Sequence, residues 1–282
     1  MIPLKDNIPT LRFPIITVAL IVINAIVYFG FQHGGLSLPN DQEAKTVKYS
    51  EIPYEITHPG KECGLITQET VDTVNSDPRL ENDLVIHRGD NVICEKRAGV
   101  LDRIGTNPGN DQPAWYLTVL FAMFMHGSLL HIAGNMLFLW IFGNNIEDSM
   151  GRLKFVAFYL LGGIAATVAQ TAVGPSSTTP NLGASGAIAA VLGAYALLYP
   201  RARVITLIFI IIFFTVLELP ALFVLGGWFL LQLLDAGTVN VANGGGVAYF
   251  AHIGGFLFGL ATIKLFATRA RDDYVQPRLP VY

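Results

Sequence analysis

The sequence predicts an all-α polytopic membrane protein of six transmembrane helices, with a large extracytoplasmic insertion between the first and the second helix. Of its 282 residues, 52% are hydrophobic and 14% are charged, whereas about 25% of the residues in a soluble domain are charged. The apolar residues also gather in six runs, and a spanning helix needs ~20 such residues. The runs are Phe13–Phe31, about Trp115–Phe142, Phe155–Val173, Ala184–Tyr199, Val204–Leu234 and Val247–Phe266.

The first run is expected to be an uncleaved transmembrane helix and not a signal peptide. The residues Tyr28-Phe29-Gly30-Phe31 stand where a signal peptide would carry small residues for cleavage. The chain then divides into four parts. These are the N-terminus with the first helix at 1–32, the insertion at 33–113, a membrane core of the other five helices at 114–267, and a tail at 268–282.

The fourth and fifth runs are irregular. Ala184–Tyr199 is short for a span, but it could extend outward through Asn181. Val204–Leu234 is too long for one straight span and contains Glu218 and Pro220. Because proline breaks a helix, we expect a shorter membrane-associated piece before Pro220 and a helix after it. Six spans are the preferred count, and seven spans are the alternative.

The basic residues of the short connections predict the orientation of the chain. Lys and Arg alternate between connections, and the segments 174–183 and 235–246 contain neither. Since cytoplasmic loops are enriched in Lys and Arg, both termini are expected in the cytoplasm and the insertion outside it. A seven-span count would place the two ends on opposite sides. The basic residues are Lys5, Arg12, Arg152, Lys154, Arg201, Arg203, Lys264, Arg269, Arg271 and Arg278.

The insertion contains both cysteines of the chain, Cys63 and Cys94. Outside the cytosol two such thiols most often pair, so a disulfide is expected, and two free thiols are the alternative. With His58 and His87 they lack the short paired spacing of zinc modules, and no metal site is expected. Short strands are expected around Leu84–Ile86 and Val92–Ile93.

No phosphate-binding loop or nucleic-acid motif is present in the sequence, and the net charge is −3. This composition argues against nucleic acid or a nucleotide as a partner, and we expect no cofactor. The lipid bilayer is the expected environment.

A serine and a histidine stand out because each lies in an apolar run among small residues. Ser185 lies in Asn181-Leu182-Gly183-Ala184-Ser185-Gly186-Ala187, and His252 lies in Ala251-His252-Ile253-Gly254-Gly255. Polar side chains within a bilayer are costly and often functional. A hydroxyl and a base that removes its proton are the minimal pair for nucleophilic catalysis. The alternative for Ser185 is a hydroxyl bonded to its own helix backbone.

Small residues favour a close approach of the two helices that carry this pair. They follow each polar residue at intervals of about one turn, a spacing that lets membrane helices touch backbone to backbone. We expect a dyad whose histidine is oriented by packing, with Glu218 in a structural or interfacial role. The small residues are Ala189 and Gly193 after Ser185, and Gly255 and Gly259 after His252.

The second run carries three further polar residues. His131 and Asn135 are four apart and share one helical face, whereas His126 and His131 are five apart and are expected to point in different directions. Asn and neutral His can donate hydrogen bonds to a developing oxyanion. The alternative is that they join helices by hydrogen bonds.

These motifs, in this order, resemble those of the bacterial-type rhomboid family of intramembrane serine proteases. The resemblance covers about residues 112–268 and leaves out 33–111. It rests on His126, His131-x-x-x-Asn135, Phe142-Gly143-Asn144-Asn145-Ile146-Glu147-Asp148 with Gly151, Gly183-Ala184-Ser185-Gly186, Tyr199-Pro200-Arg201-Ala202-Arg203 and Ala251-His252-Ile253-Gly254-Gly255.

The resemblance implies a role for each matching residue. Ser185 would be the nucleophile and His252 the base. His131 and Asn135, with the backbone N–H of Ser185, would bind the oxyanion. His126, Gly183 and Gly186 would lie nearby in supporting positions.

Two positions depart from the family pattern. Ala189 stands where relatives often carry an aromatic ring that supports the histidine, so Tyr249 or Phe250 is the candidate for that role. Trp115-Tyr116-Leu117-Thr118 lacks the arginine that many members have there, so we expect the membrane-dipping part of the outer loop to be built differently.

The resemblance also implies the substrate and the setting. The substrates would be membrane proteins, cleaved in a transmembrane helix near the outer surface, and the Asn240–Gly246 segment could act as a lid. The expected location is a prokaryotic plasma membrane. Two other hypotheses are a six-span transporter or channel with a histidine proton relay, and a non-catalytic rhomboid-like protein that binds membrane clients.

Overall fold

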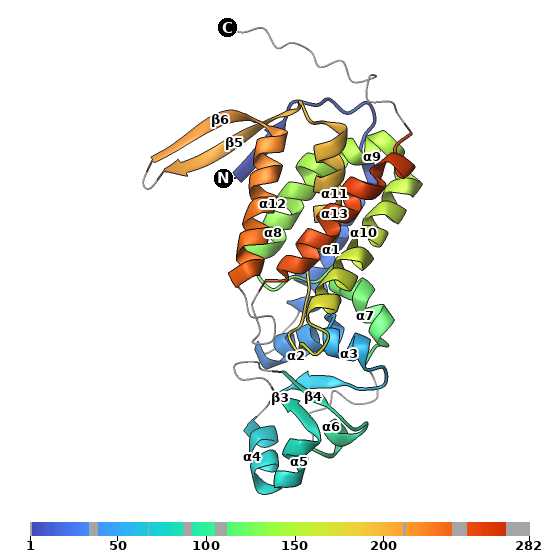
Figure 1. Cartoon of the computed structure of the whole chain (residues 1–282), viewed down its shortest axis with the longest axis vertical. Coiled ribbons are helices and arrows are strands. Elements are labelled where there is room, and N and C mark those ends of the chain that lie inside the picture. The colour runs from blue at the N-terminus through green and yellow to red at the C-terminus, as the bar shows by residue number, and fades with distance from the viewer. Residues whose placement is uncertain are drawn as a thin grey trace.

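The computed structural model describes residues 2–33, 39–66, 68–86, 92–104, 112–210, 213–238 and 247–268. These residues form a helical bundle with a smaller outer domain, residues 39–104, at one end (Figure 1). The described part is mostly helical, as expected, and it also contains two three-stranded sheets, of which the sequence predicted strands only in the insertion. The lid expected at 240–246, the tail beyond Thr268 and His87 lie outside the described residues.

Six apolar helical stretches follow the order of the six predicted runs. Four are long and apolar enough to cross a membrane and two are shorter, so the chain is a multi-pass membrane protein, and the count of six spans stays a prediction. The four long stretches are α1 (Ile15–Ile26) with η1 (Val27–Gln32); α8 (Leu129–Phe138) with η2 (Leu139–Gly143) and α9 (Asn144–Met150); α10 (Arg152–Val173); and α13 (Tyr249–Phe266). The shorter two are α11 (Ser185–Leu198) and α12 (Ala221–Thr238).

The second apolar run is divided into two helices. Its first part is the separate helix α7 (Trp115–Ala122), which lies at the end of the bundle nearest the outer domain (Figure 1). The membrane stretch begins at Leu129, because Ser128 caps it and accepts a 3.2 Å hydrogen bond from the N–H of His131. Residues 123–128 between the two helices are therefore not helical.

Helix α11 begins at Ser185 and does not extend outward to Asn181. Gly183 leaves the helical conformation with a φ of 128°, and its N–H donates a 2.8 Å hydrogen bond to the carbonyl of Ala122. The 14 residues of α11 rise about 21 Å at ~1.5 Å per residue, less than the ~30 Å of a bilayer core. Helix α11 by itself is therefore shorter than the hydrocarbon core is thick.

Glycines bring α11 and α13 into backbone contact. A Cβ at Gly193 would collide with the carbonyl oxygen of Phe256, one at Gly255 with the oxygen of Gly186, and one at Gly259 with the oxygen of Ala190. No larger residue fits these positions without moving a helix. The small-residue faces expected from the sequence therefore meet, and they set the separation of the two helices.

Acidic residues hold the other end of the bundle together. Glu147 of α9 accepts hydrogen bonds from the N–H groups of Ile16 and Thr17, at 3.0 and 2.8 Å. These are first-turn N–H groups of α1, which have no acceptor within their own helix. Asp6 accepts 2.6 Å hydrogen bonds from Asn145 and from the hydroxyl of Tyr195. Helix α9, at the end of the second long stretch, thus anchors both α1 and the N-terminal strand.

The piece expected before Pro220 is a β-hairpin. Strands β5 (Arg203–Ile210) and β6 (Phe213–Pro220) pair antiparallel, and β1 (Ile2–Asp6) pairs with β5 to give the order β1-β5-β6. The β-branched and aromatic residues of this run favour extended strands. The break expected at Pro220 is present, since α12 begins at the next residue.

The outer domain is built around a second antiparallel sheet with the strand order β2-β4-β3. The strands expected at Leu84–Ile86 and around Val92 are β3 and β4 of this sheet. Its elements are α2 (Pro39–Tyr49), α3 (Pro53–Thr57), β2 (Cys63–Leu65), α4 (Gln68–Ser76), α5 (Pro78–Asn82), β3 (Leu84–Ile86), β4 (Val92–Glu95) and α6 (Val100–Arg103).

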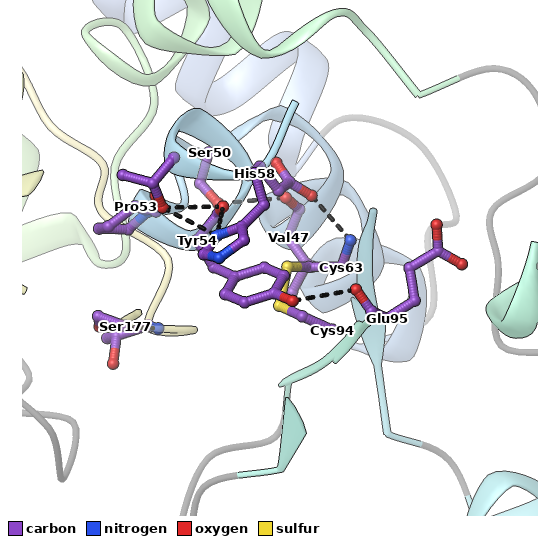
Figure 2. Close-up of a disulfide and its surroundings, with 12 residues drawn as sticks. Val47, Ser50, Pro53, Tyr54, His58, Cys63, Cys94, Glu95 and Ser177 are labelled. Atoms are coloured by element: carbon purple, nitrogen blue, oxygen red, sulfur yellow. Dashed lines mark hydrogen bonds between the residues drawn. A yellow bond between two sulfur atoms is a disulfide. The ribbon is translucent and has the colours of Figure 1, made fainter. Parts of the chain in front are cut away.

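A disulfide crosses this sheet. Cys63 of β2 pairs directly with Cys94 of β4, and a disulfide joins them (Figure 2). Successive side chains of a strand point to opposite faces, and Cys94 belongs to one buried cluster with Tyr54, while Ile93 belongs to another with Leu101. The central strand therefore supplies two small hydrophobic cores.

The glycine contacts predict opposite effects of alanine at two helical positions. Gly259→Ala should lower stability by about 1–3 kcal/mol, because the added methyl overpacks the α11–α13 interface. Gly226→Ala in α12 is the matched control, since nothing lies within 4 Å of its added Cβ, and it should be neutral or stabilising by up to about 1 kcal/mol. Thermal unfolding in detergent measures both. Equal melting temperatures for the two variants would contradict the prediction.

Candidate active site

The structure brings Ser185 and His252 together. Ser185 is the first residue of α11, and His252 lies in the first turn of α13. The Nε2 atom of His252 is 2.8 Å from the Oγ atom of Ser185. Both side chains are half-buried, so the pair is removed from bulk solvent without being closed off from it.

The other ring nitrogen of His252 has a partner that the sequence reasoning missed. Nδ1 lies 2.7 Å from the amide oxygen Oε1 of Gln232, on α12. An amide oxygen can only accept, so Nδ1 carries the proton and Nε2 presents its lone pair to Ser185. The histidine is thus oriented by a hydrogen bond, where the sequence predicted orientation by packing alone.

The ring beside His252 is Trp228, not Tyr249 or Phe250 as the sequence suggested. Its centroid lies 5.8 Å from that of the imidazole. Trp228 and Gln232 are four residues apart on α12 and so share one face of that helix. The rule that polar residues within apolar helices are functional candidates would have found Gln232 had it been applied to this run.

A second glutamine fixes the start of α13. Gln170 of α10 is buried, and its Oε1 accepts a 3.2 Å hydrogen bond from the N–H of Ala251. First-turn N–H groups need an acceptor outside their own helix, and Gln170 supplies one next to His252. The position of the imidazole is therefore set from two neighbouring helices, α10 and α12.

A cavity of about 600 Å³ opens onto the pair. The residues that line it come from α8, α11, α12, α13 and the loop before α11, and they are both apolar and polar. The polar residues of this lining include His131, Asn135, Asn181, Ser185 and His252.

Several residues that line this cavity carry hydrogen-bond donors. The Nδ2 atom of Asn135 is buried and has no hydrogen-bond partner among the described residues. The N–H of Ser185 belongs to the first turn of α11, where backbone donors lack an acceptor within the helix. His131 lies against Gly183, where an added Cβ would come within 2.9 Å of the imidazole. These groups can stabilise a negative charge that develops beside Ser185.

His126 lies beside His131, which corrects the expectation from helical spacing. The two ring centroids are 5.1 Å apart, because His126 precedes α8 and is not helical. Gln32 of η1 holds its backbone, accepting from the N–H of His126 at 2.9 Å and donating to its carbonyl at 3.2 Å. The first span thereby fixes the turn that leads into α8.

Other candidate groups take no part in this cluster. Glu218 is exposed on β6, consistent with the interfacial role expected for it. Within the described part of the chain, no three His, Cys, Asp or Glu side chains are grouped so that they could hold a metal ion.

The outer domain holds the loop that leads to Ser185. Glu51 and Asn181 exchange two backbone hydrogen bonds, of 3.0 and 2.7 Å. Tyr54, which lies beside the disulfide in Figure 2, donates its backbone N–H to the carbonyl of Ser177 at 3.0 Å. Thr57 donates its hydroxyl to the carbonyl of Pro175 at 2.6 Å. Three consecutive parts of the α10–α11 loop are thus tied to the insertion.

The side chain of Glu51 is buried at this junction. Thr171 of α10 donates a 3.3 Å hydrogen bond to its Oε1. Burial raises the pKa of Glu51 to about 8, and burial likewise raises the pKa of Glu55 to about 7. The folded protein therefore favours the protonated form of Glu51 near neutral pH, and Glu55 changes its protonation in that range.

The chain belongs to the rhomboid family. The family described as “Rhomboid domain” matches residues 113–269, more than half of the chain. This range contains Ser185, His252 and the helices that carry them, and it leaves out the outer domain.

Curated proteins with rhomboid names are similar to half or more of the chain. Presenilin-associated rhomboid-like protein A, mitochondrial, from Danio rerio is 34% identical over 180 residues, which are 60% of this chain and 43% of that protein. Rhomboid protein 1, mitochondrial, from Saccharomyces cerevisiae is 28% identical over 154 residues, 51% of this chain and 40% of that protein. RHOMBOID-like protein 5 from Arabidopsis thaliana is 24% identical over 237 residues, 83% of this chain and 69% of that protein.

These relatives do not support every detail of the sequence prediction. The chain spans less than half the length of the mitochondrial relatives that it matches. All three proteins named above are eukaryotic, and two are mitochondrial by name. They support an integral membrane protein of the rhomboid family, but not the bacterial type or the prokaryotic plasma membrane expected from the sequence.

The burial of Glu51 predicts a pH-dependent stability. The pKa of Glu51 is higher in the folded protein, about 8, than in the unfolded chain, near 4.5. Its contribution to the free energy of unfolding is therefore fully present below pH 4.5 and is lost as the pH rises to about 8. The melting temperature in detergent should therefore drop between pH 5 and pH 8. Glu51→Gln should reduce that drop, whereas Glu218→Gln, which removes an exposed carboxyl group, should not. An unchanged pH dependence in Glu51→Gln would contradict the assignment.

Proposed function

We propose that this chain is an intramembrane serine endopeptidase that uses a Ser-His dyad. The observation that carries the proposal is the 2.8 Å contact between Ser185 Oγ and His252 Nε2 at the end of a 600 Å³ cavity. The family supports the same class of reaction. The proposal needs no metal and no cofactor.

The first half-reaction forms an acyl-enzyme. Nε2 of His252 takes the proton of the Ser185 hydroxyl, and Oγ attacks the carbonyl carbon of the scissile peptide bond. The tetrahedral intermediate expels the amine, which receives the proton from Nε2 as the C–N bond breaks. The hydrogen bond from Nδ1 to Gln232 keeps the imidazole in the tautomer and orientation that both proton transfers need.

The second half-reaction consumes water. His252 takes a proton from a water molecule, which attacks the ester carbonyl, and the released Ser185 oxygen takes the proton back. In both steps the oxyanion would be held by Asn135, His131 and the N–H of Ser185. Losing one such donor typically costs about 10²–10³-fold in rate, which is substantial but well below the roughly 10⁶-fold loss typical when a serine protease loses its nucleophile or its base.

The substrate class follows from the position of the site. A helix as short as α11 can begin below the membrane surface, and the cavity beside its first residue is lined partly by apolar residues such as Leu130, Phe138 and Trp228. A transmembrane helix that unwinds near its outer end could place its backbone there. Small, helix-breaking residues near the cleaved bond would ease this unwinding, because an intact helix hides its carbonyl groups in hydrogen bonds.

Covalent labelling tests the nucleophile directly. A fluorophosphonate probe should label the purified full-length protein, and Ser185→Ala should abolish both the labelling and the cleavage of a reporter transmembrane helix. Ser149→Ala is a matched control, since Ser149 lies at the far end of the membrane core and bonds to its own helix. Labelling that persists in Ser185→Ala, or cleavage without Ser185, would overturn the proposal.

The role of Gln232 can be separated from a general packing role. Gln232→Leu keeps a similar volume but cannot accept from Nδ1, so kcat should fall about 10-fold or more, within the range of acid–base catalysis. KM should change little, because Gln232 is assigned no contact with the substrate. Gln232→Glu retains an acceptor oxygen and should preserve much of kcat. Equal losses in both variants would indicate a packing role only.

A further inference from the structure

The β5–β6 hairpin leaves the bundle at the end opposite the outer domain and projects sideways (Figure 1). The end of β6 that is farther from α12 is called its outer end. It lies level with the first turns of α12 and does not extend beyond the end of the bundle. Helix α12 is one of the apolar helices of the membrane core. A membrane that surrounds the start of α12 therefore also reaches the outer end of β6.

Both faces of this part of the hairpin are apolar. Successive residues of a strand point to opposite sides, so Phe213 and Leu217 lie on one face and Phe214 and Val216 on the other. Their exposed fractions are 72%, 44%, 73% and 53% in that order. Antiparallel sheets often turn one polar face toward water, but the only polar residue among Phe213–Leu217 is Thr215, which is half-buried.

Charged residues are confined to the root of the sheet. Lys5 of β1, Arg201 and Arg203 are exposed there, and Glu218 lies opposite Ile205 near the start of β5. Cationic side chains are favoured beside anionic headgroups. Charged side chains therefore lie at the root of the hairpin and apolar side chains at its outer end. This order is the same as that of the headgroup and acyl-chain layers of a lipid leaflet.

The backbone limits how deeply the hairpin can lie. In the order β1-β5-β6, the outer edge of β6 has no neighbouring strand within the described sheet. An open edge does not occur within the hydrocarbon core, since unpaired N–H and C=O groups cannot be solvated there. The side chains are thus too apolar for water, while the backbone is too polar for the centre of the bilayer.

The surface of the hairpin is also continuous with a lipid-facing surface. Leu222 and Phe223, which immediately follow β6 at the start of α12, are exposed. Together these observations identify acyl chains as the occupant of both faces of the hairpin. We propose that the β5–β6 hairpin is a lipid-binding element whose outer residues, Phe213–Leu217, insert into the interfacial layer of the leaflet opposite the outer domain.

Site-directed spin labelling tests this placement. Both native cysteines are joined in the disulfide, so a label attaches selectively to a single cysteine introduced as Phe213→Cys or Phe214→Cys. In the full-length protein in phosphatidylethanolamine–phosphatidylglycerol vesicles, both labels should collide readily with oxygen and poorly with a water-soluble nickel chelate. Arg201→Cys is the control, and its label should show the opposite preference.

Two results would overturn the proposal. Nickel access at position 213 or 214 equal to that at 201 would show that the face in question meets water. A defined short distance between labels on two copies would show that protein and not lipid covers the hairpin. If either phenylalanine variant fails to fold, Val216→Cys and Leu217→Cys sample the same two faces with smaller changes.

Discussion

The backbone contact between α11 and α13 is the constraint on which the rest of the structure depends. Gly193, Gly255 and Gly259 leave no room for a side chain between the helices, and in a bilayer such contact replaces the hydrophobic drive that assembles soluble proteins. Ser185 and His252 stand at matching ends of these helices. Their 2.8 Å separation is therefore a consequence of how closely two backbones can approach.

Three glutamines within this apolar bundle bind groups on other segments, and these hydrogen bonds determine where their partners lie. Gln232 binds the imidazole of His252, and Gln170 binds the first turn of its helix. Gln32 similarly binds the backbone of His126. An unpaired polar group in such surroundings is costly, so each hydrogen bond also excludes other positions of its side chain. Among the described residues, the buried Nδ2 donor of Asn135 has no such partner, and the proposed mechanism gives it one in the oxyanion.

The insertion contributes to the site although it lies outside the family match. Its Glu51 and Tyr54 bind the loop before Ser185 through backbone hydrogen bonds, which depend on the course of the chain and little on residue type. The insertion has its own sheet, disulfide and cores. A structure that forms its own core can hold a loop in place without changing the chemistry of the membrane helices.

The sequence by itself determined the membrane class, the apolar helical stretches, the strands of the insertion and the choice of Ser185 and His252 as the residues to examine, because apolar runs, turn residues and isolated polar groups are local signals. It did not determine that the run before Pro220 is a hairpin, that His126 and His131 touch, or that Gln232 and Trp228 support His252. Each of these depends on which helices or strands become neighbours. Which segments become neighbours depends on close packing between parts of the chain that are far apart in sequence. The residue spacing within one segment therefore does not predict it.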